Sequence, residues 1–226
     1  MPFSRLVLAI VLCSTKTADV RPVFERLFRK FGMPQSIQCD NGIPFVAVRA
    51  RAGLSALSAW WVSLGISIVR SRRSCPQDNG AHERMHRDLS AEMQDAPAAT
   101  SALQQRLLDK WKQEFNHVRP HQALGGKTPA EVYSGTLRAQ SPTPPAISGR
   151  VQSEYRVHSN GCFYVRKQWY FLSLSLSGFN VGLERLDALN VRVWFYGIDL
   201  GTVEIEPTVD DSVYLGATRR GQRKVA

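Results

Sequence analysis

The chain has 226 residues, of which 43% are hydrophobic and 21% are charged. This composition is typical of globular proteins and excludes collagen-like or largely disordered chains. The 29 Lys and Arg residues outnumber the 19 Asp and Glu residues, so the net charge is +10. Such an excess favours a polyanionic partner, with nucleic acid ahead of an anionic membrane surface. Most of it lies in residues 1–140, which carry 19 basic and 11 acidic residues.

The first apolar stretch, residues 6–13 (LVLAIVLC), is rich in β-branched residues and predicts a strand that is buried on both faces. It is far shorter than the roughly 20 residues of a membrane helix. Leu12 before Cys13 does not suit signal cleavage, which requires small residues. The four cysteines form no CxxC pair, which favours reduced thiols in the cytoplasm.

Helical and strand patterns alternate over the next hundred residues. Thr17 is a plausible N-cap for a helix that Gly32 and Pro34 end. The further expected elements are a strand at 36–39, an apolar helix at 53–65, a strand at 66–69, and helices at 78–95 and 100–117. This order predicts an α/β fold.

The pattern changes near residue 138. Residues 141–145 (SPTPP) have the composition of a linker. Beyond them, short β-rich runs at 151–157, 161–173, 189–196 and 202–206 predict a small all-β, barrel-like domain. The expected domains are an α/β core at 1–137, a Pro/Ser-rich linker at 138–150, a β domain at 151–215 and a basic tail at 216–226.

Two acidic residues stand out by their positions. Asp40 follows the expected strand at 36–39, and ligand crevices of open α/β sheets form where strands end. Glu83 lies near the start of the helix at 78–95. Carboxylates from separate elements can hold divalent metals for phosphodiester chemistry. The alternatives are a turn aspartate and an exposed helix glutamate favoured by the helix dipole.

The same helix contains the pattern H-E-x-x-H at His82-Glu83-Arg84-Met85-His86. Two histidines four residues apart share a helix face and could bind zinc, with the glutamate as general base. This gives a remote alternative, a zinc metallopeptidase. Such an enzyme needs a third ligand, and no histidine follows at the usual spacing.

Four motifs in order give a more specific interpretation. They are Val20–Gly32 (VRPVFERLFRKFG), Gln38–Gly42 (QCDNG), Cys75–Arg84 (CPQDNGAHER), and Phe115–Leu124 (FNHVRPHQAL) followed by Thr128–Ala130 (TPA). Together they resemble the integrase catalytic core of bacterial insertion-sequence transposases, which is related to retroviral integrases. The resemblance implies a DDE-type, ribonuclease H-like core over Arg21–Tyr133. The β-rich tail is similar, with weaker motifs, to the small C-terminal domain of related transposases.

Carried over to this sequence, the resemblance makes Asp40 and Glu83 the second and third metal-binding catalytic acids. The implied cofactor is Mg²⁺ or Mn²⁺, and the implied partners are element ends and target DNA, with homo-oligomers or intact transposase subunits. The implied chemistry is metal-dependent cleavage and transfer of DNA strands. The implied location is the cytoplasmic nucleoid, without membrane association. His82 and His86 would then be incidental or would touch DNA.

The chain departs from the family pattern at its beginning. The family places its first catalytic aspartate on an earlier strand, whereas Ser4-Arg5 already resembles the start of the third strand. We therefore expect an N-terminally truncated, catalytically incomplete core in which residues 6–13 are more exposed than their composition suits, as at a sheet edge. The alternative to an enzyme is a non-catalytic DNA-binding or oligomerising transposase remnant.

Five arginines lie in and around the loop before the helix that carries Glu83. They are Arg70, Arg72, Arg73, Arg84 and Arg87. We predict that they contact DNA phosphates, which supply affinity but little sequence information. The alternative is a solvated basic surface.

Overall fold

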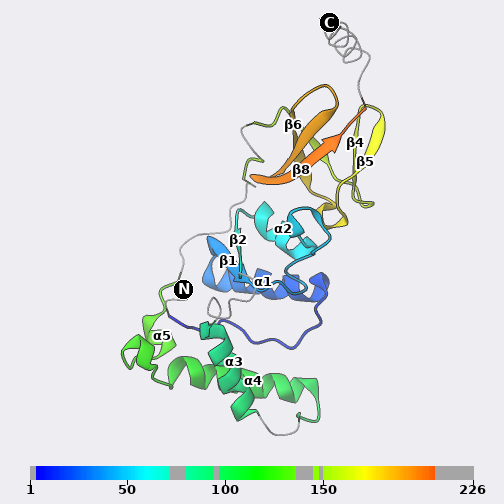
Figure 1. Ribbon diagram of the computed structural model, residues 1–226. Helices are drawn as coiled ribbons and strands as arrows, with labels where there is room; N and C mark the ends of the chain where they lie inside the picture. Colours follow the sequence, from blue (N-terminus) through cyan, green and yellow to red (C-terminus); the bar gives the residue numbers. More distant parts are fainter. Residues whose placement is uncertain (1–3, 72–79, 94–96, 136–144, 148–149, 207–226) are drawn as a thin grey trace, which may run out of the picture. The chain divides into compact units, whose positions relative to one another are not determined.

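The computed structural model describes residues 4–71, 80–93, 97–135, 145–147 and 150–206 (Figure 1). The chain divides into two compact units. The first consists of Met1–Asn41 and Val69–Gln140, and the second of Gly42–Ile68 and Ser141–Ala226. The segment 42–68 is thus grouped with the C-terminal part of the chain. The domain boundaries at 137 and 151 stay a prediction, and the expected basic tail lies outside the described residues.

Helices dominate the first unit, and strand β1 pairs with β2, whose residues Ser67 and Ile68 are grouped with the second unit. In chain order these elements are α1 (Thr17–Phe31), β1 (Ser36–Cys39), β2 (Ser67–Arg70), α3 (Gly80–Glu92), α4 (Ser101–His117), η3 (Gln122–Leu124) and α5 (Pro129–Val132). They confirm the predicted helices and both short strands to within a few residues. The predicted cap of α1 is off by one position, because Thr17 is already helical and Lys16 precedes it.

Capping and glycine set the ends of these helices. The Thr100 hydroxyl accepts a hydrogen bond from the Leu103 amide at the start of α4. At α5, Thr128 and Glu131 form a reciprocal capping box. At the end of α1, Gly32 adopts a φ of 80°, a backbone conformation that residues other than glycine rarely adopt.

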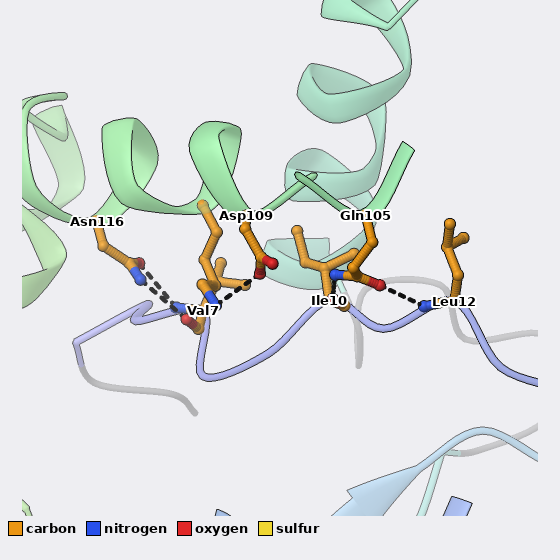
Figure 2. A network of polar contacts seen from close by, with 7 residues as sticks. Val7, Ile10, Leu12, Gln105, Asp109 and Asn116 are labelled. Atoms are coloured by element: carbon orange, nitrogen blue, oxygen red, sulfur yellow. Dashed lines mark hydrogen bonds and ion pairs between the residues drawn. The ribbon is translucent and has the colours of Figure 1, made fainter. Parts of the chain in front are cut away.

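The predicted strand at residues 6–13 is wrong. No strand lies beside this segment among the described residues, and it has no regular secondary structure. It runs along α4 instead, where side chains of the helix bond its backbone (Figure 2). An apolar, β-branched sequence cannot become a strand without a neighbouring strand to pair with.

The second unit contains one α-helix and an all-β part. Its elements are η1 (Arg51–Gly53), α2 (Ala56–Ser63), β3 (Ser153–Arg156), β4 (Cys162–Val165), β5 (Gln168–Phe171), η4 (Leu174–Leu176), β6 (Asn180–Arg185), β7 (Asn190–Phe195) and β8 (Ile198–Glu204). Four strands form an antiparallel sheet in the order β3-β6-β7-β8, and β4 and β5 form a separate hairpin. The predicted barrel is not confirmed, because no pairing between described residues closes the sheet from β3 to β8.

The core of the second unit joins α2 to this sheet. Almost every residue of α2 is buried, so the helix needs cover on all sides. Ala59 and Val62 of the helix share one hydrophobic cluster with Leu54 and with strand residues such as Val193 and Phe195. The apolar helix expected within the N-terminal core therefore packs with the C-terminal strands.

Strand β6 is absent from the sequence prediction. Gly182 lies in its middle, opposite Trp194 of β7 and Glu154 of β3. A Cβ at this position would overlap the side chains of Val151 and Ile147, so only glycine allows that approach. The close packing requires glycine at position 182, and the same glycine weakens the alternating apolar pattern by which a strand is predicted from sequence.

Over the part of the chain that the structure describes, no helix has both the length and the apolar character needed to cross a bilayer.

Candidate functional site

Asp40 follows directly after β1 and is exposed, whereas Cys39 before it is buried. The backbone here is joined to the segment that follows β2. The Ser71 amide donates to the Cys39 carbonyl oxygen at 3.1 Å, and the Asn41 side-chain amide donates to the Ser71 carbonyl oxygen at 3.0 Å. These bonds hold the carboxylate of Asp40 at the end of the two-stranded sheet, as the sequence predicts.

Glu83 lies in the first turn of α3 and is also exposed. A carboxylate at this end of a helix is favoured by the partial positive charge of the unpaired backbone amides. The helix therefore presents Glu83 to solvent near its start, which is where a metal-binding acid is expected.

The imidazole of His82 is affected by the charges of both acids. Partial burial of this largely exposed side chain lowers the pKa of its imidazole, and the neighbouring His86 lowers that pKa further. The negative charges of Asp40 and Glu83 oppose this change, so both carboxylates lie within electrostatic range of His82. The structure thus places Asp40 from the end of β1 in the neighbourhood of α3.

This neighbourhood is not a three-ligand metal cage. Among the described residues, no group of three or more His, Cys, Asp or Glu side chains is arranged to hold one ion. The zinc metallopeptidase alternative needs three protein ligands, and the described part of the chain offers no third ligand to His82 and His86.

The two histidines contact each other. Their Nε2 atoms lie 2.9 Å apart, and their rings meet edge to face with centroids 4.4 Å apart. The spacing of four residues on α3 places both rings on one helix face, as the sequence pattern indicates.

Three of the five predicted DNA-binding arginines are described, and all three are exposed. Arg70 ends β2, and its charge acts on Cys39 beside Asp40. Arg84 and Arg87 lie three residues apart on α3 and share a face of the helix. Arg72 and Arg73 lie outside the described residues.

The Cys39 thiol supports the same arrangement at the sheet end. Burial raises the pKa of this thiol, and the charge of Asp40 raises it further, whereas Arg70 lowers it. Asp40 and Arg70 therefore both lie within electrostatic range of one buried sulfur at this end of the sheet.

A cavity of about 270 Å³ lies next to this site within the first unit. Four parts of the chain line it: residues 5–9, Leu27 of α1, a set from α3, and Phe115 with His121. The α3 residues are Ala81, His82, Arg84, Met85 and Asp88. The His121 Nε2 atom is buried and finds no hydrogen-bond partner among the described residues. His82 and Arg84 also line this cavity, whose surface is largely apolar.

Two polar residues of α4 have a role that the sequence did not reveal. The Asn116 side chain accepts from the Val7 amide and donates to the Val7 carbonyl oxygen, both at 2.9 Å. Gln105 accepts from the Leu12 amide at 2.9 Å and donates to the Ile10 carbonyl oxygen at 2.8 Å. Figure 2 shows both amides turned toward the N-terminal segment. These partners are about a hundred residues apart in sequence, and no local pattern marks them.

Comparison with known proteins gives a class for part of the chain. Residues 64–129 match the family described as "Integrase core domain". This segment contains β2, α3 and α4 and therefore Glu83, but it ends before α5 is complete and does not include Asp40. This part of the chain is thus similar to an integrase core, as the motifs within it indicate.

A curated relative is "Insertion element IS407 uncharacterized 31.7 kDa protein" of Burkholderia multivorans (strain ATCC 17616 / 249). It is 25% identical to this chain over 129 residues, which are 57% of this chain and 44% of the relative. The chain thus matches less than half the length of that protein.

Two solved structures are also similar. The catalytic core domain of BIV integrase has 28% identity and a TM-score of 0.42, covering 57% of this chain and 78% of that one. The simian T-cell lymphotropic virus intasome in complex with PP2A regulatory subunit B56 gamma has 15% identity and a TM-score of 0.36, covering 86% of this chain and 66% of that one. At these TM-scores neither structure adds to the argument.

Proposed function

We propose that this protein acts in DNA transposition as the integrase-core protein of an insertion element. The observation that carries the proposal is the integrase-core match over residues 64–129, which includes Glu83 on α3. The electrostatic neighbourhood of Asp40, Glu83 and His82 supports it. On this proposal the core is ribonuclease H-like, the β-rich unit is its small, barrel-like C-terminal domain, and the protein works at the cytoplasmic nucleoid.

Asp40 and Glu83 fit the ligand chemistry of Mg²⁺ or Mn²⁺. Mg²⁺ keeps several waters and usually takes one or two protein carboxylates together with substrate phosphates. Two exposed carboxylates that both lie within electrostatic range of His82 fit that demand. A bound divalent ion would activate water or a 3′-hydroxyl for attack on a phosphodiester bond and would neutralise charge on the leaving oxygen.

The arginines on α3 would bind the DNA backbone. Arg84 and Arg87 follow Glu83 on α3, and Arg70 ends β2 near Cys39 and Asp40. Phosphates drawn to these guanidinium groups would lie next to the two acids. The chain's own residues would thus hold the DNA strand where the metal ion acts.

We further propose that this chain alone binds DNA without cutting it efficiently. The family chemistry uses three acids, and the described residues bring no third metal ligand to Asp40 and Glu83. A non-catalytic DNA-binding or oligomerising role, with copies of itself or with complete transposase subunits, is therefore the second candidate function.

Nicking of supercoiled plasmid separates the two candidates. Purified protein is incubated with plasmid in Mn²⁺ or Mg²⁺, beside the variants Glu83→Gln and Asp40→Asn. The binding role predicts the same background nicking for all three proteins. Metal-dependent nicking that both variants lose would establish the enzyme instead.

Salt-dependent DNA binding tests the arginines. We expect Arg84→Glu with Arg87→Glu to weaken binding and to reduce the slope of log affinity against log salt by about one per lost phosphate contact. Arg106→Glu with Lys110→Glu on α4 is the matched control, since both residues are exposed on a helix and the change in net charge is the same. Equal losses in the two variants would mean that only net charge matters and would contradict the proposed contacts.

A further inference from the structure

The histidine pair on α3 has no role in the function proposed above. His82 and His86 are exposed, and the only hydrogen bond that the described residues give either ring is the one between their Nε2 atoms. A hydrogen bond between two imidazole nitrogens needs one of them to be an unprotonated acceptor. At least one ring therefore offers a lone pair toward the point where the two rings meet.

The spacing of these two atoms fits chelation of one ion. Two nitrogens on a tetrahedral Zn²⁺ at about 2.0–2.1 Å lie roughly 3.3 Å apart, and ligands at right angles on Ni²⁺ or Cu²⁺ lie roughly 3.0 Å apart. The Nε2 atoms are 2.9 Å apart in the structure. Small rotations of the two side chains would therefore admit an ion, and α3 would keep its backbone unchanged.

We propose that His82 and His86 form a two-nitrogen site for a late first-row transition-metal ion such as Zn²⁺, Ni²⁺ or Cu²⁺. Imidazole nitrogen suits these ions, whereas Mg²⁺ prefers oxygen ligands. The site is thus chemically distinct from the carboxylates of Asp40 and Glu83, although it lies beside them. Water or a further donor completes the coordination, since the described residues supply no third protein ligand.

The proposal does not depend on the proposed function. It requires only the geometry of one helix face, and it holds whether or not the protein cuts DNA. It also differs from the peptidase alternative, because a site with two protein ligands binds an ion without forming the three-ligand centre of such an enzyme.

Calorimetric titration of tag-free, full-length protein with NiCl₂ tests the site. Ni²⁺ is the better first probe because it favours imidazole, whereas Zn²⁺ also binds thiolates and the chain has free thiols at Cys13, Cys39 and Cys162. We expect one strong site per chain, weakened by more than about tenfold in both His82→Gln and His86→Gln. His117→Gln, which changes an exposed histidine at the end of α4, is the control and should bind as the unchanged protein does.

Imidazole ¹⁵N spectra identify the ligands directly. On addition of Zn²⁺, we expect the Nε2 resonances of His82 and His86 to shift together while that of His117 stays in place. Shifts confined to other histidines, or Ni²⁺ affinity unchanged in both glutamine variants, would overturn the proposal. Circular dichroism melting confirms that the variants remain folded.

Two further titrations separate this site from the acids. We expect Glu83→Gln to retain the Ni²⁺ site and a large excess of Mg²⁺ to leave it occupied. Ni²⁺ binding that is lost in Glu83→Gln but kept in His86→Gln would show that the carboxylates hold the ion, and the histidine site would be refuted. Plasmid nicking and DNA binding remain separate measurements, so a failure of the proposed function leaves this result intact.

Discussion

The segment 6–13 is rich in leucine, valine and isoleucine, and strand β7 is rich in valine and aromatic residues. Their structures nevertheless differ. Strand β7 lies between β6 and β8, and its residues Val191, Val193 and Phe195 are buried in alternation with partly exposed ones. The segment 6–13 has no strand beside it among the described residues, and Leu12 is 49% exposed. A β-type sequence gains its structure from paired neighbours and not from its own preference.

The two regions also satisfy their backbone groups differently. The backbone of β7 pairs with the neighbouring strands β6 and β8. The backbone of the N-terminal segment instead forms hydrogen bonds with the side chains of Asn116 and Gln105 of α4. Eleven helical residues and five extended residues each span roughly 16 Å, so the helix spacing between these amides matches the chain from Val7 to Leu12. The match explains how a helix can hold an extended segment that lacks a strand partner.

Truncation of Phe195 should have the largest effect. Its side chain is fully buried in the core of the second unit, so Phe195→Ala should lower the free energy of unfolding by about 3–5 kcal/mol. Leu12→Ala should cost less than about 0.5 kcal/mol, because about half of Leu12 is exposed. Urea denaturation followed by circular dichroism measures both values. An equal loss of unfolding free energy in the two variants would mean that Leu12 is buried in solution, and it would contradict the difference between the two regions.

A side chain at position 182 should be the next most damaging change. The Cβ of Gly182→Ala would overlap Val151 and Ile147, so we expect a loss of about 1–3 kcal/mol from overpacking. Gly178→Ala is not a suitable control, because Gly178 has a positive φ of 86°. The better control is Gly80→Ala, where a Cβ meets nothing within 4 Å. A neutral Gly182→Ala would show that β6 does not approach these side chains closely.

Removal of the Asn116 amide should release the N-terminal segment. Asn116 is buried and provides both partners of the Val7 backbone, so Asn116→Ala should cost about 1–2 kcal/mol. Hydrogen exchange at the Val7 amide should accelerate, with Gln113→Ala as an exposed control on the same helix. If the Val7 amide keeps its protection in Asn116→Ala, then another group protects it and the contact in Figure 2 is not what holds the segment.

The sequence predicts the elements whose signals are local. The apolar spacing of α1 and α4, the Gly32 stop and the short strands before Asp40 and after Gly65 are all found in the structure. Strand β6 is missed because Gly182 interrupts its pattern for reasons of packing against distant residues. The fate of residues 6–13 is missed because it depends on which strands lie nearby, and this information is not local.

The candidate site divides in the same way. The positions of Asp40 at a strand end and Glu83 in the first turn of a helix could be predicted, and the structure has them there. Their common neighbourhood with His82 could not be inferred from spacing, because it depends on how the end of β1 approaches α3. The Asn116 and Gln105 contacts join residues about a hundred positions apart, so no periodicity reveals them.

The smallest expected effect concerns the ion pair that joins α3 to the segment after α4. Both guanidinium amino groups of Arg119 donate to the Glu92 carboxylate, and Arg119 also stacks over Trp111. The hydrogen bonds from Arg119 lower the pKa of Glu92 below its ordinary value of 4.5. A lowered carboxylate pKa means that the folded state binds this proton less readily than the unfolded state does. The pair therefore stabilises the protein above about pH 4.5, and this contribution disappears as the pH falls through the lowered pKa.

Melting of the unchanged protein and of Glu92→Gln between pH 7 and pH 3 measures this contribution. The Glu92 side chain is 40% exposed, so the difference at neutral pH should stay below about 1 kcal/mol. It should be constant down to about pH 5 and then shrink, since only the unchanged protein loses a charge at this position. Glu114→Gln is the control, because Glu114 approaches Arg119 only to 3.7 Å. A difference that persists at pH 3 would mean that Glu92 supports α3 through packing and not through its charge.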